Sequence, residues 1–299
     1  MFMPEDRTRL TLARSERDTY GVFCKGAEST TPLANGFCFG EGPRWFEGLL
    51  WFSDMLGEAV HTVNLAGDVT TLALAGHAPS GLGFRPDGSL LIASTERRAL
   101  LSYDGESVEA LADLSDVVPA SIGDMVVDDR GRAYVGSQAF EGGVIARVDP
   151  DGAITVVAQD LDFPNGMVIT PDGATLIVAE SVARRLTAFT VGSDGALSDR
   201  RVFAEGLDGP PDGITLDAAG GVWAAMTLAH QFERIELGGN VTDRIDIGDR
   251  TAIACTLGGP QRRTLFLLSS TDAYPQRLVG TKLSRVDTVT VDIPGAGLP

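Results

Sequence analysis

Three oxygen-bearing side chains lie in short glycine- and proline-rich segments, each at a similar distance before a turn. Glu41 lies in "GEGP", Asn165 in "PNG" and Asp212 in "PDG". Asn165 and Asp212 precede the closing glycine of the next turn by eight residues, and Glu41 precedes its glycine by seven. Carboxylate and amide oxygens gathered at one place repel one another or stay unsatisfied unless a positive charge lies among them. The three residues therefore predict a site for a divalent cation.

The donor types favour a hard metal ion with open coordination positions. Calcium takes about six to eight oxygen ligands, so three side chains leave positions for water or substrate, which is the condition for catalysis. We expect one divalent ion, Ca²⁺ in the first place, with Mg²⁺, Mn²⁺ and Zn²⁺ as alternatives. Each tripeptide taken alone is more typical of a turn than of a metal ligand, so the shared spacing carries the prediction.

Six segments along the chain share one pattern, a turn followed by a short apolar strand. Their markers stand 44, 43, 42, 47 and 41 residues apart, at Pro43, Asp87, Arg130, Asp172, Ala219 and Pro260. Units of about 40 to 50 residues, each with room for four strands, are typical of propeller blades. The sequence predicts an all-β fold, a single six-bladed β-propeller domain over residues 1–299 with the metal site in its central channel.

The two ends of the repeat array are expected to meet and close the ring. The apolar stretch "DTVTVDIP", residues 287–294, follows the sixth marker at the distance needed to complete the last blade. We expect it to pair with part of the N-terminal flank, residues 1–35.

Counting back from each turn gives one residue per repeat at the start of the innermost strand. In a propeller these positions face the channel and form a ring, here called the column. The column consists of Glu41, Ser80, Gly123, Asn165, Asp212 and Ala254. Second strands run back and end on the same face, which predicts a second ring of Asp54, Thr95, Gln138, Glu180 with Ser181, Thr227 and Ser270. Ordinary polarity at strand ends explains this second ring equally well.

Composition limits the function classes. The formal net charge of −17 argues against binding to nucleic acid or to an anionic membrane, since both need clustered basic residues. The three cysteines lack C-x-x-C spacing and cannot all pair, and the N-terminus lacks an apolar signal region. We expect a cytoplasmic protein, a monomer or weak homo-oligomer, whose partner is a small-molecule substrate.

Six motifs, in a fixed order, resemble a known family. They are "GEGPRW" (40–45), "PSGLGFRPDG" (79–88), "GDMVVDDRGRAYVG" (123–136), "FPNGMVITPDG" (163–173), "PDGITLDAAGGVW" (211–223) and "CTLGGPQRRTLF" (255–266). The chain resembles the SMP-30/gluconolactonase/LRE family of six-bladed propellers, which includes regucalcin-type gluconolactonases and calcium-dependent lactonases and phosphotriesterases. The resemblance implies metal binding by Glu41, Asn165 and Asp212, the three residues that the spacing also selects.

The chain departs from the family pattern at positions that contact substrate. The family's Asn in Asn-Asp is Gly123 here, followed by Asp124, and a neighbouring Arg and Asn are replaced by Ser121 and Ser137. These changes remove polar contacts used with sugar-acid lactones. We expect the space opened by Gly123 to accept a bulkier or less polar substrate.

The leading functional hypothesis is a metal-dependent carboxylic-ester hydrolase, a lactonase in which metal-activated water opens the ring. Asp212 is the candidate catalytic residue, as ligand and proton acceptor. The candidate substrate-binding residues are Asp124, Gln138, Glu180, His77, Ser80 and Gly123. Two alternatives are an isomerase or cyclase acting on a natural-product intermediate at the same site, and a non-enzymatic propeller that binds a protein partner.

Overall fold

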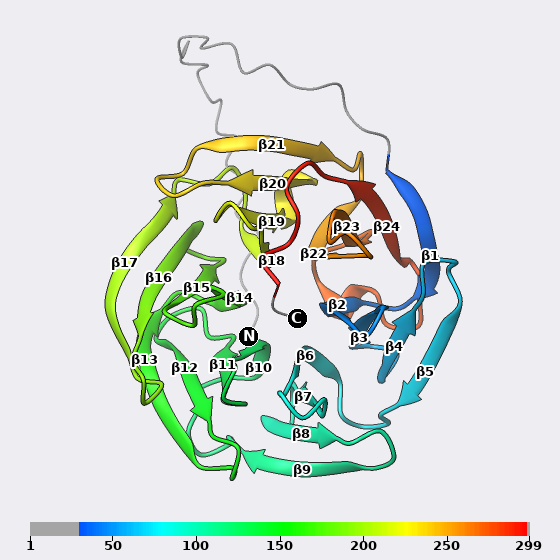
Figure 1. Cartoon of the computed structure of the whole chain (residues 1–299). Helices are drawn as coiled ribbons and strands as arrows, with labels where there is room; N and C mark the ends of the chain where they lie inside the picture. Colours follow the sequence, from blue (N-terminus) through cyan, green and yellow to red (C-terminus); the bar gives the residue numbers. More distant parts are fainter. Residues whose placement is uncertain (1–29, 298–299) are drawn as a thin grey trace, which may run out of the picture.

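The computed structural model describes residues 30–297 and arranges them as six four-stranded antiparallel sheets around a central axis (Figure 1). The predicted six-bladed β-propeller is confirmed. Blades 1 to 5 each use four consecutive strands, and the first strand of each is the innermost. The strands are β2 (Gly40–Phe46), β3 (Leu49–Asp54), β4 (Ala59–Val63) and β5 (Val69–Ala73) in blade 1; β6 (Pro79–Phe84), β7 (Leu90–Ser94), β8 (Ala99–Tyr103) and β9 (Val108–Asp113) in blade 2; β10 (Ile122–Val127), β11 (Ala133–Ser137), β12 (Gly143–Val148) and β13 (Ile154–Leu161) in blade 3; β14 (Pro164–Ile169), β15 (Thr175–Glu180), β16 (Arg185–Val191) and β17 (Leu197–Glu205) in blade 4; β18 (Pro211–Leu216), β19 (Val222–Met226), β20 (Gln231–Ile235) and β21 (Val241–Asp246) in blade 5.

Blade 6 closes the ring with strands from both ends of the sequence. It contains β22 (Thr251–Gly258), β23 (Thr264–Ser270), β24 (Ser284–Thr290) and, outermost, β1 (Thr31–Phe37). β1 pairs antiparallel with β24, with Thr31 opposite Thr288. The last strand therefore starts earlier than the expected stretch 287–294. Of the flank 1–35, residues 31–35 take part in the closing strand, and residues 1–29 lie outside the described part.

Blade-to-blade packing supplies the core. Each of the six buried apolar clusters draws its residues from two neighbouring blades; one of them joins Leu91 and Leu100 of blade 2 to Met125 and Val135 of blade 3. All six residues of β10 are buried, whereas the outermost β21 has none that is fully buried. A strand that is buried along its whole length is covered on both faces. The innermost strands are therefore held rigidly from both sides.

A bulge near the start of each of the first five innermost strands sets the direction of the column side chains. Strand pairing is interrupted between Pro164 and Met167 in β14 and between Pro211 and Ile214 in β18, with equivalent breaks in blades 1 to 3. A bulge bends its strand and re-aims the local side chains. Asn165 and Asp212 lie inside these bulges.

Glycine after the column residue brings neighbouring innermost strands together. A Cβ atom at Gly166 would overlap the carbonyl oxygen of Asp212 and lie 2.6 Å from the amide nitrogen of Ile214. Gly42 meets Ser80 of the next blade in the same way, at 2.5 Å from its carbonyl oxygen. Blade 3 reverses this order, with Gly123 at the column position and Asp124 after it. The ring is therefore narrow, and blade 3 presents a different side chain to the channel.

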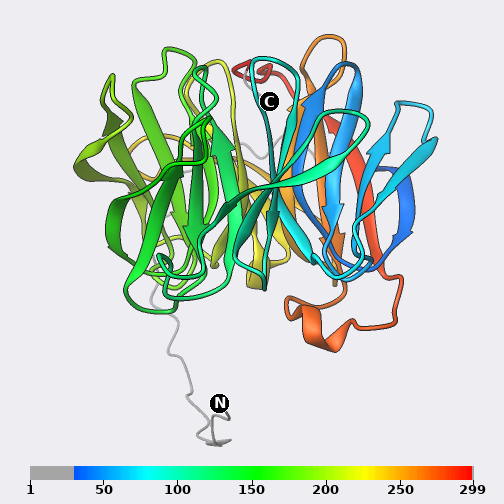
Figure 2. The same cartoon turned by 90° about the horizontal axis from the view of Figure 1, so that it is seen from below.

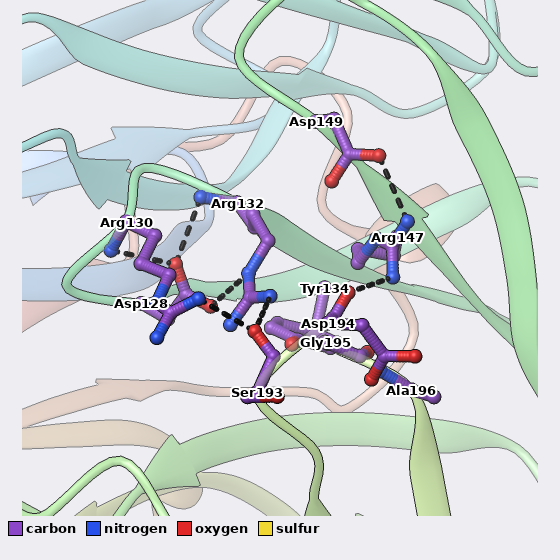
Figure 3. Close-up of polar contacts among 10 residues, drawn as sticks. All are labelled: Asp128, Arg130, Arg132, Tyr134, Arg147, Asp149, Ser193, Asp194, Gly195 and Ala196. Carbon is purple, nitrogen blue, oxygen red and sulfur yellow. Dashed lines mark hydrogen bonds and ion pairs between the residues drawn. The ribbon is translucent and has the colours of Figure 1, made fainter.

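A polar contact away from the innermost strands ties blade 3 to blade 4 (Figure 3). Arg132 donates to Asp128 at 2.6 Å and to the carbonyl oxygen of Ser193 at 3.2 Å. Arg147 donates to the next carbonyl oxygen, that of Asp194, at 2.6 Å. The β16–β17 turn is thus held against blade 3.

The C-terminal segment lies beside the end of β18, on the face where the innermost strands end (Figures 1 and 2). Gly295 bridges Asp217, and the amide of Ala296 donates to Leu216 at 3.0 Å. The loop that holds the short 3₁₀ helix η2 (Pro275–Arg277) projects from the opposite face. The column residues therefore open toward that opposite face, here called the mouth of the channel. No helix within residues 30–297 is long and apolar enough to cross a membrane.

Candidate metal centre

The column residues of blades 1 to 5 occupy the second position of their innermost strands. Glu41 lies in β2, Asn165 in β14 and Asp212 in β18, and the side chains of Glu41 and Asn165 are buried. Asn165 Nδ2 donates to Asp212 Oδ1 at 2.5 Å. The structure thus joins two of the three predicted metal ligands directly.

Two residues of the second ring hold this pair in place. Thr227, the first residue of the 3₁₀ helix η1 (Thr227–Ala229), donates to Asp212 Oδ2 at 3.3 Å. Ser181 lies 3.3 Å from Asn165 Nδ2 and donates its hydroxyl to the carbonyl oxygen of Pro211 at 2.7 Å. Asn165 Nδ2 donates hydrogen bonds to Asp212 and Ser181. The amide oxygen Oδ1 therefore remains as the acceptor or metal ligand.

Three carboxyl groups act on one another in the channel. Burial raises the pKa of Glu41 well above its ordinary range, and the charges of Asp212 and Asp124 raise it further. Burial likewise raises the pKa of Asp212 well above its ordinary range, and Asp124 adds to the shift. Both burial and the neighbouring like charges disfavour ionisation of these groups. A bound cation would favour their ionised forms.

Arg44 is a functional candidate to which sequence reasoning assigned no role. Its buried guanidinium donates to the carbonyl oxygens of Pro43 at 2.7 Å and Met125 at 2.5 Å. Burial lowers the pKa of Arg44, whereas the neighbouring Asp124 raises it. Arg44 lies within "GEGPRW", three residues after Glu41. This closeness to a column residue is the feature of the sequence that could have identified it as a candidate.

The charges and donor types around the channel fit a divalent cation. Ionised Glu41, Asp124 and Asp212 with protonated Arg44 leave a net charge of −2. Asp124 Oδ1 is buried and has no hydrogen-bond partner in the described structure. Within residues 30–297, no three His, Cys, Asp or Glu side chains are grouped closely enough to hold a metal by themselves. An ion at the mouth therefore needs the amide of Asn165 among its ligands.

The space expected above Gly123 is filled, so that expectation was wrong. A Cβ atom at Gly123 would lie 2.7 Å from Cδ and 2.9 Å from Cγ of Gln138, with Nε2 closer still. Gln138 follows β11 and therefore reaches the column from the second strand of the same blade. The structure thus brings the predicted substrate-binding residues Gln138, Gly123 and Asp124 to one place.

Glu180 does not reach the channel, contrary to its predicted role as a substrate contact. Its carboxylate accepts two hydrogen bonds from Arg185 at 2.8 Å, and Arg200 and Thr187 add further ones. Burial alone would raise the pKa of Glu180, but the hydrogen bonds from Arg185 and Thr187 lower it below the ordinary range. The group is a buried ion pair within blade 4. Asp54 is similarly engaged, accepting from the backbone amides of Cys38 and Phe39.

Two other candidates sit in blade 2. Ser80 is buried at the second position of β6, and its carbonyl oxygen accepts from the Ser53 hydroxyl at 2.6 Å. His77 lies two residues before β6, with Nδ1 3.4 Å from the hydroxyl oxygen of Ser94. Burial and the charge of Arg97 lower the pKa of His77. The contacts of His77 thus involve none of the three predicted metal ligands.

Comparisons with known proteins agree with this architecture. Residues 39–271 match the family model of the SMP-30/Gluconolactonase/LRE-like region. The chain is 30% identical over 276 residues to 6-deoxy-6-sulfogluconolactonase of Pseudomonas putida, covering 87% of this chain and 94% of the relative. It is 27% identical over 238 residues to a pentonolactonase of Haloferax volcanii, covering 77% and 81% of the two chains. A solved gluconolactonase of Xanthomonas campestris superposes with a TM-score of 0.73 at 26% identity, over 88% of this chain and 91% of that one. The chain belongs to the SMP-30/gluconolactonase/LRE-like family.

Proposed function

We propose that this protein is a metal-dependent lactonase, which opens a lactone or a related cyclic ester with water at the channel mouth. The observation that carries the proposal is the mutual repulsion of the buried carboxyl groups of Glu41, Asp124 and Asp212, of which only Asp124 has a buried positive neighbour, Arg44. Such a set of charges is costly in a buried site without a divalent partner. The lactonase names of two relatives and of one solved structure support the reaction class.

The residues that would hold the ion are Glu41, Asn165 and Asp212. Their oxygens are the hard donors that Ca²⁺ accepts, and Mg²⁺ or Mn²⁺ could use the same set. When bound, the ion would polarise the lactone carbonyl and make water more acidic. The remaining chemistry falls to side chains of this chain.

Asp212 is the proposed general base. Its Oδ1 is engaged by Asn165 at 2.5 Å, while Oδ2 has a longer contact of 3.3 Å with Thr227. Oδ2 would accept a proton from water as the water oxygen bonds to the carbonyl carbon. Asp212 would return that proton to the ring oxygen as the C–O bond breaks, giving a hydroxy acid. Thr227 and Asn165 would keep the carboxylate in a fixed orientation throughout.

The channel mouth offers few of the polar contacts that a sugar-acid lactone would use. Ser137 is fully buried, and its hydroxyl oxygen accepts a hydrogen bond from the amide of Val144 at 2.9 Å. The hydroxyl group is therefore engaged within blade 3. Gln138 and Asp124 are the polar groups left beside Gly123. These two residues are the proposed contacts for the substrate or the ion in blade 3.

The reaction is tested on a panel of sugar-acid, alkyl and aryl lactones, with and without a chelator. The proposal predicts ring opening that stops on chelation and returns with a divalent ion. In H₂¹⁸O, hydrolysis adds one solvent oxygen to the product. Turnover without solvent oxygen would indicate an isomerase or cyclase instead, and a metal-free protein without turnover would favour a binding scaffold.

A further inference from the structure

Gln138 occupies the place that a column side chain would take in blade 3. The three heavy atoms nearest to a Cβ at Gly123 all belong to Gln138, and they are Nε2, Cδ and Cγ. None of these three atoms belongs to the backbone. The carboxamide of Gln138 therefore lies in the ring of column side chains, between Ser80 of blade 2 and Asn165 of blade 4.

The backbone fixes this position. The amide of Gln138 donates to the carbonyl oxygen of Ser121 at 2.7 Å, which ties the end of the second strand to the segment that precedes β10. One residue earlier, Ser137 pairs with Ile122. Gln138 thus starts beside the column, and its side chain has only to cross Gly123 to enter the channel.

The carboxamide itself is free of internal partners. Within residues 30–297, the side chain of Gln138 makes no hydrogen bond to another residue, although it is half-buried. The carboxamide is therefore available to bind a ligand or water. Asp124, the next residue after Gly123, also has an unpartnered oxygen, Oδ1.

We infer that Gln138 supplies, from the second strand, the amide oxygen that the column lacks at Gly123, and so acts as a further ligand of the ion. The inference rests on the metal site of the proposed function. It explains together why position 123 has no side chain and why Gln138 has no other partner. Blade 3 would then contribute a neutral oxygen to the site, as Asn165 does from blade 4.

The test is calorimetric titration of Ca²⁺ into metal-stripped protein. Gln138→Met keeps the length of the side chain and removes the oxygen. We expect affinity to fall about tenfold or more, the size of loss that even an outer partner of a metal site typically causes. Gln138→Glu keeps an oxygen and should retain Ca²⁺ binding. The matched control is Gln159→Met, at an exposed position of β13, which should bind as the wild type does.

A transfer of the amide within blade 3 gives a second, independent readout. Gly123→Asn alone should push the flexible side chain of Gln138 out of its place, because the new Cβ overlaps it. Gly123 does not have a positive φ, so Asn fits there once Gln138 is shortened. The double variant Gly123→Asn/Gln138→Ala should therefore recover Ca²⁺ affinity that Gln138→Ala loses, with a melting temperature close to the wild type.

The outcomes separate the inference from the proposed function. Wild-type affinity in Gln138→Met, or no recovery in a folded double variant, would overturn the role of Gln138 and leave the lactonase proposal standing. Gln138-dependent Ca²⁺ binding without turnover of any lactone would support Gln138 and overturn the lactonase. A wild-type protein that binds no divalent ion would overturn both.

Discussion

Asn165 Nδ2 and Asp212 Oδ1 lie 2.5 Å apart and join the innermost strands of blades 4 and 5 at the mouth of the channel. The Asn165-Gly166 dipeptide is therefore part of β14 and not a hairpin turn. Glycine is required at position 166 for a separate reason, because its missing Cβ lets β14 lie against Asp212 and Ile214 of β18. One dipeptide thus provides a polar group for the site and the close approach that places it.

Replacing Asp212 with Asn should separate catalysis from folding. The change removes the proposed base and relieves repulsion with Asp124, so we expect lactone turnover to fall at least about 100-fold while the melting temperature stays equal or rises. Steady-state kinetics and thermal melting measure the two effects. Near wild-type turnover in the folded variant would remove Asp212 from its assigned role.

Replacing Arg44 with Met should destabilise the metal-free protein. The variant leaves the buried carboxyl group of Asp124 without its positive neighbour, and loss of one partner of a buried pair typically costs about 3–5 kcal/mol. Urea unfolding after chelation measures the loss. Adding Asp124→Asn to Arg44→Met should restore part of it, because one of the repelling charges is then gone. An Arg44→Met protein as stable as the wild type would contradict this charge balance.

Glu180→Gln should change how the free energy of unfolding depends on pH and leave catalysis unchanged. The pKa of Glu180 is lowered in the folded state, so its ionised form stabilises the fold above about the ordinary value of 4.5, and this contribution is lost as pH falls through the lowered pKa. We expect the variant to lose about 1.5–3 kcal/mol at pH 7 and the difference to shrink in acid. Unfolding measured across pH tests the direction of this pH dependence. A large fall in kcat would indicate that Glu180 does take part in substrate binding or catalysis.

Gly166→Ala should disturb the ring itself. Its Cβ meets backbone atoms of Asp212 and Ile214, which side-chain movement cannot relieve, so we expect a loss of about 3 kcal/mol together with most of the turnover. Gly220→Ala is the control, because that turn glycine has open space around it and a φ of 84°. The control should lose about 1–2 kcal/mol and keep its activity. Equal effects in both variants would argue against a special role of the β14–β18 contact.

The sequence predicted the fold because each blade repeats one local pattern, and the column followed because one position per repeat faces the axis. Neighbouring residues were harder to assign. Gln138 and Glu180 both lie at the ends of second strands, yet one turns to the channel and the other to Arg185 within its blade. The role of Arg44 became clear only from its contacts with Met125 and Asp124 of another blade. Such choices depend on partners distant in the sequence, which the repeat does not encode.

The central claim is that one divalent ion is held at the channel mouth by Glu41, Asn165 and Asp212. The most direct measurement is calorimetric titration of Ca²⁺ into the chelator-treated protein, compared with the Glu41→Gln and Asn165→Leu variants. We predict one site per chain in the wild type, with binding weakened at least about tenfold in each folded variant. Binding of no ion by the wild type, or equal binding by all three proteins, would contradict the account.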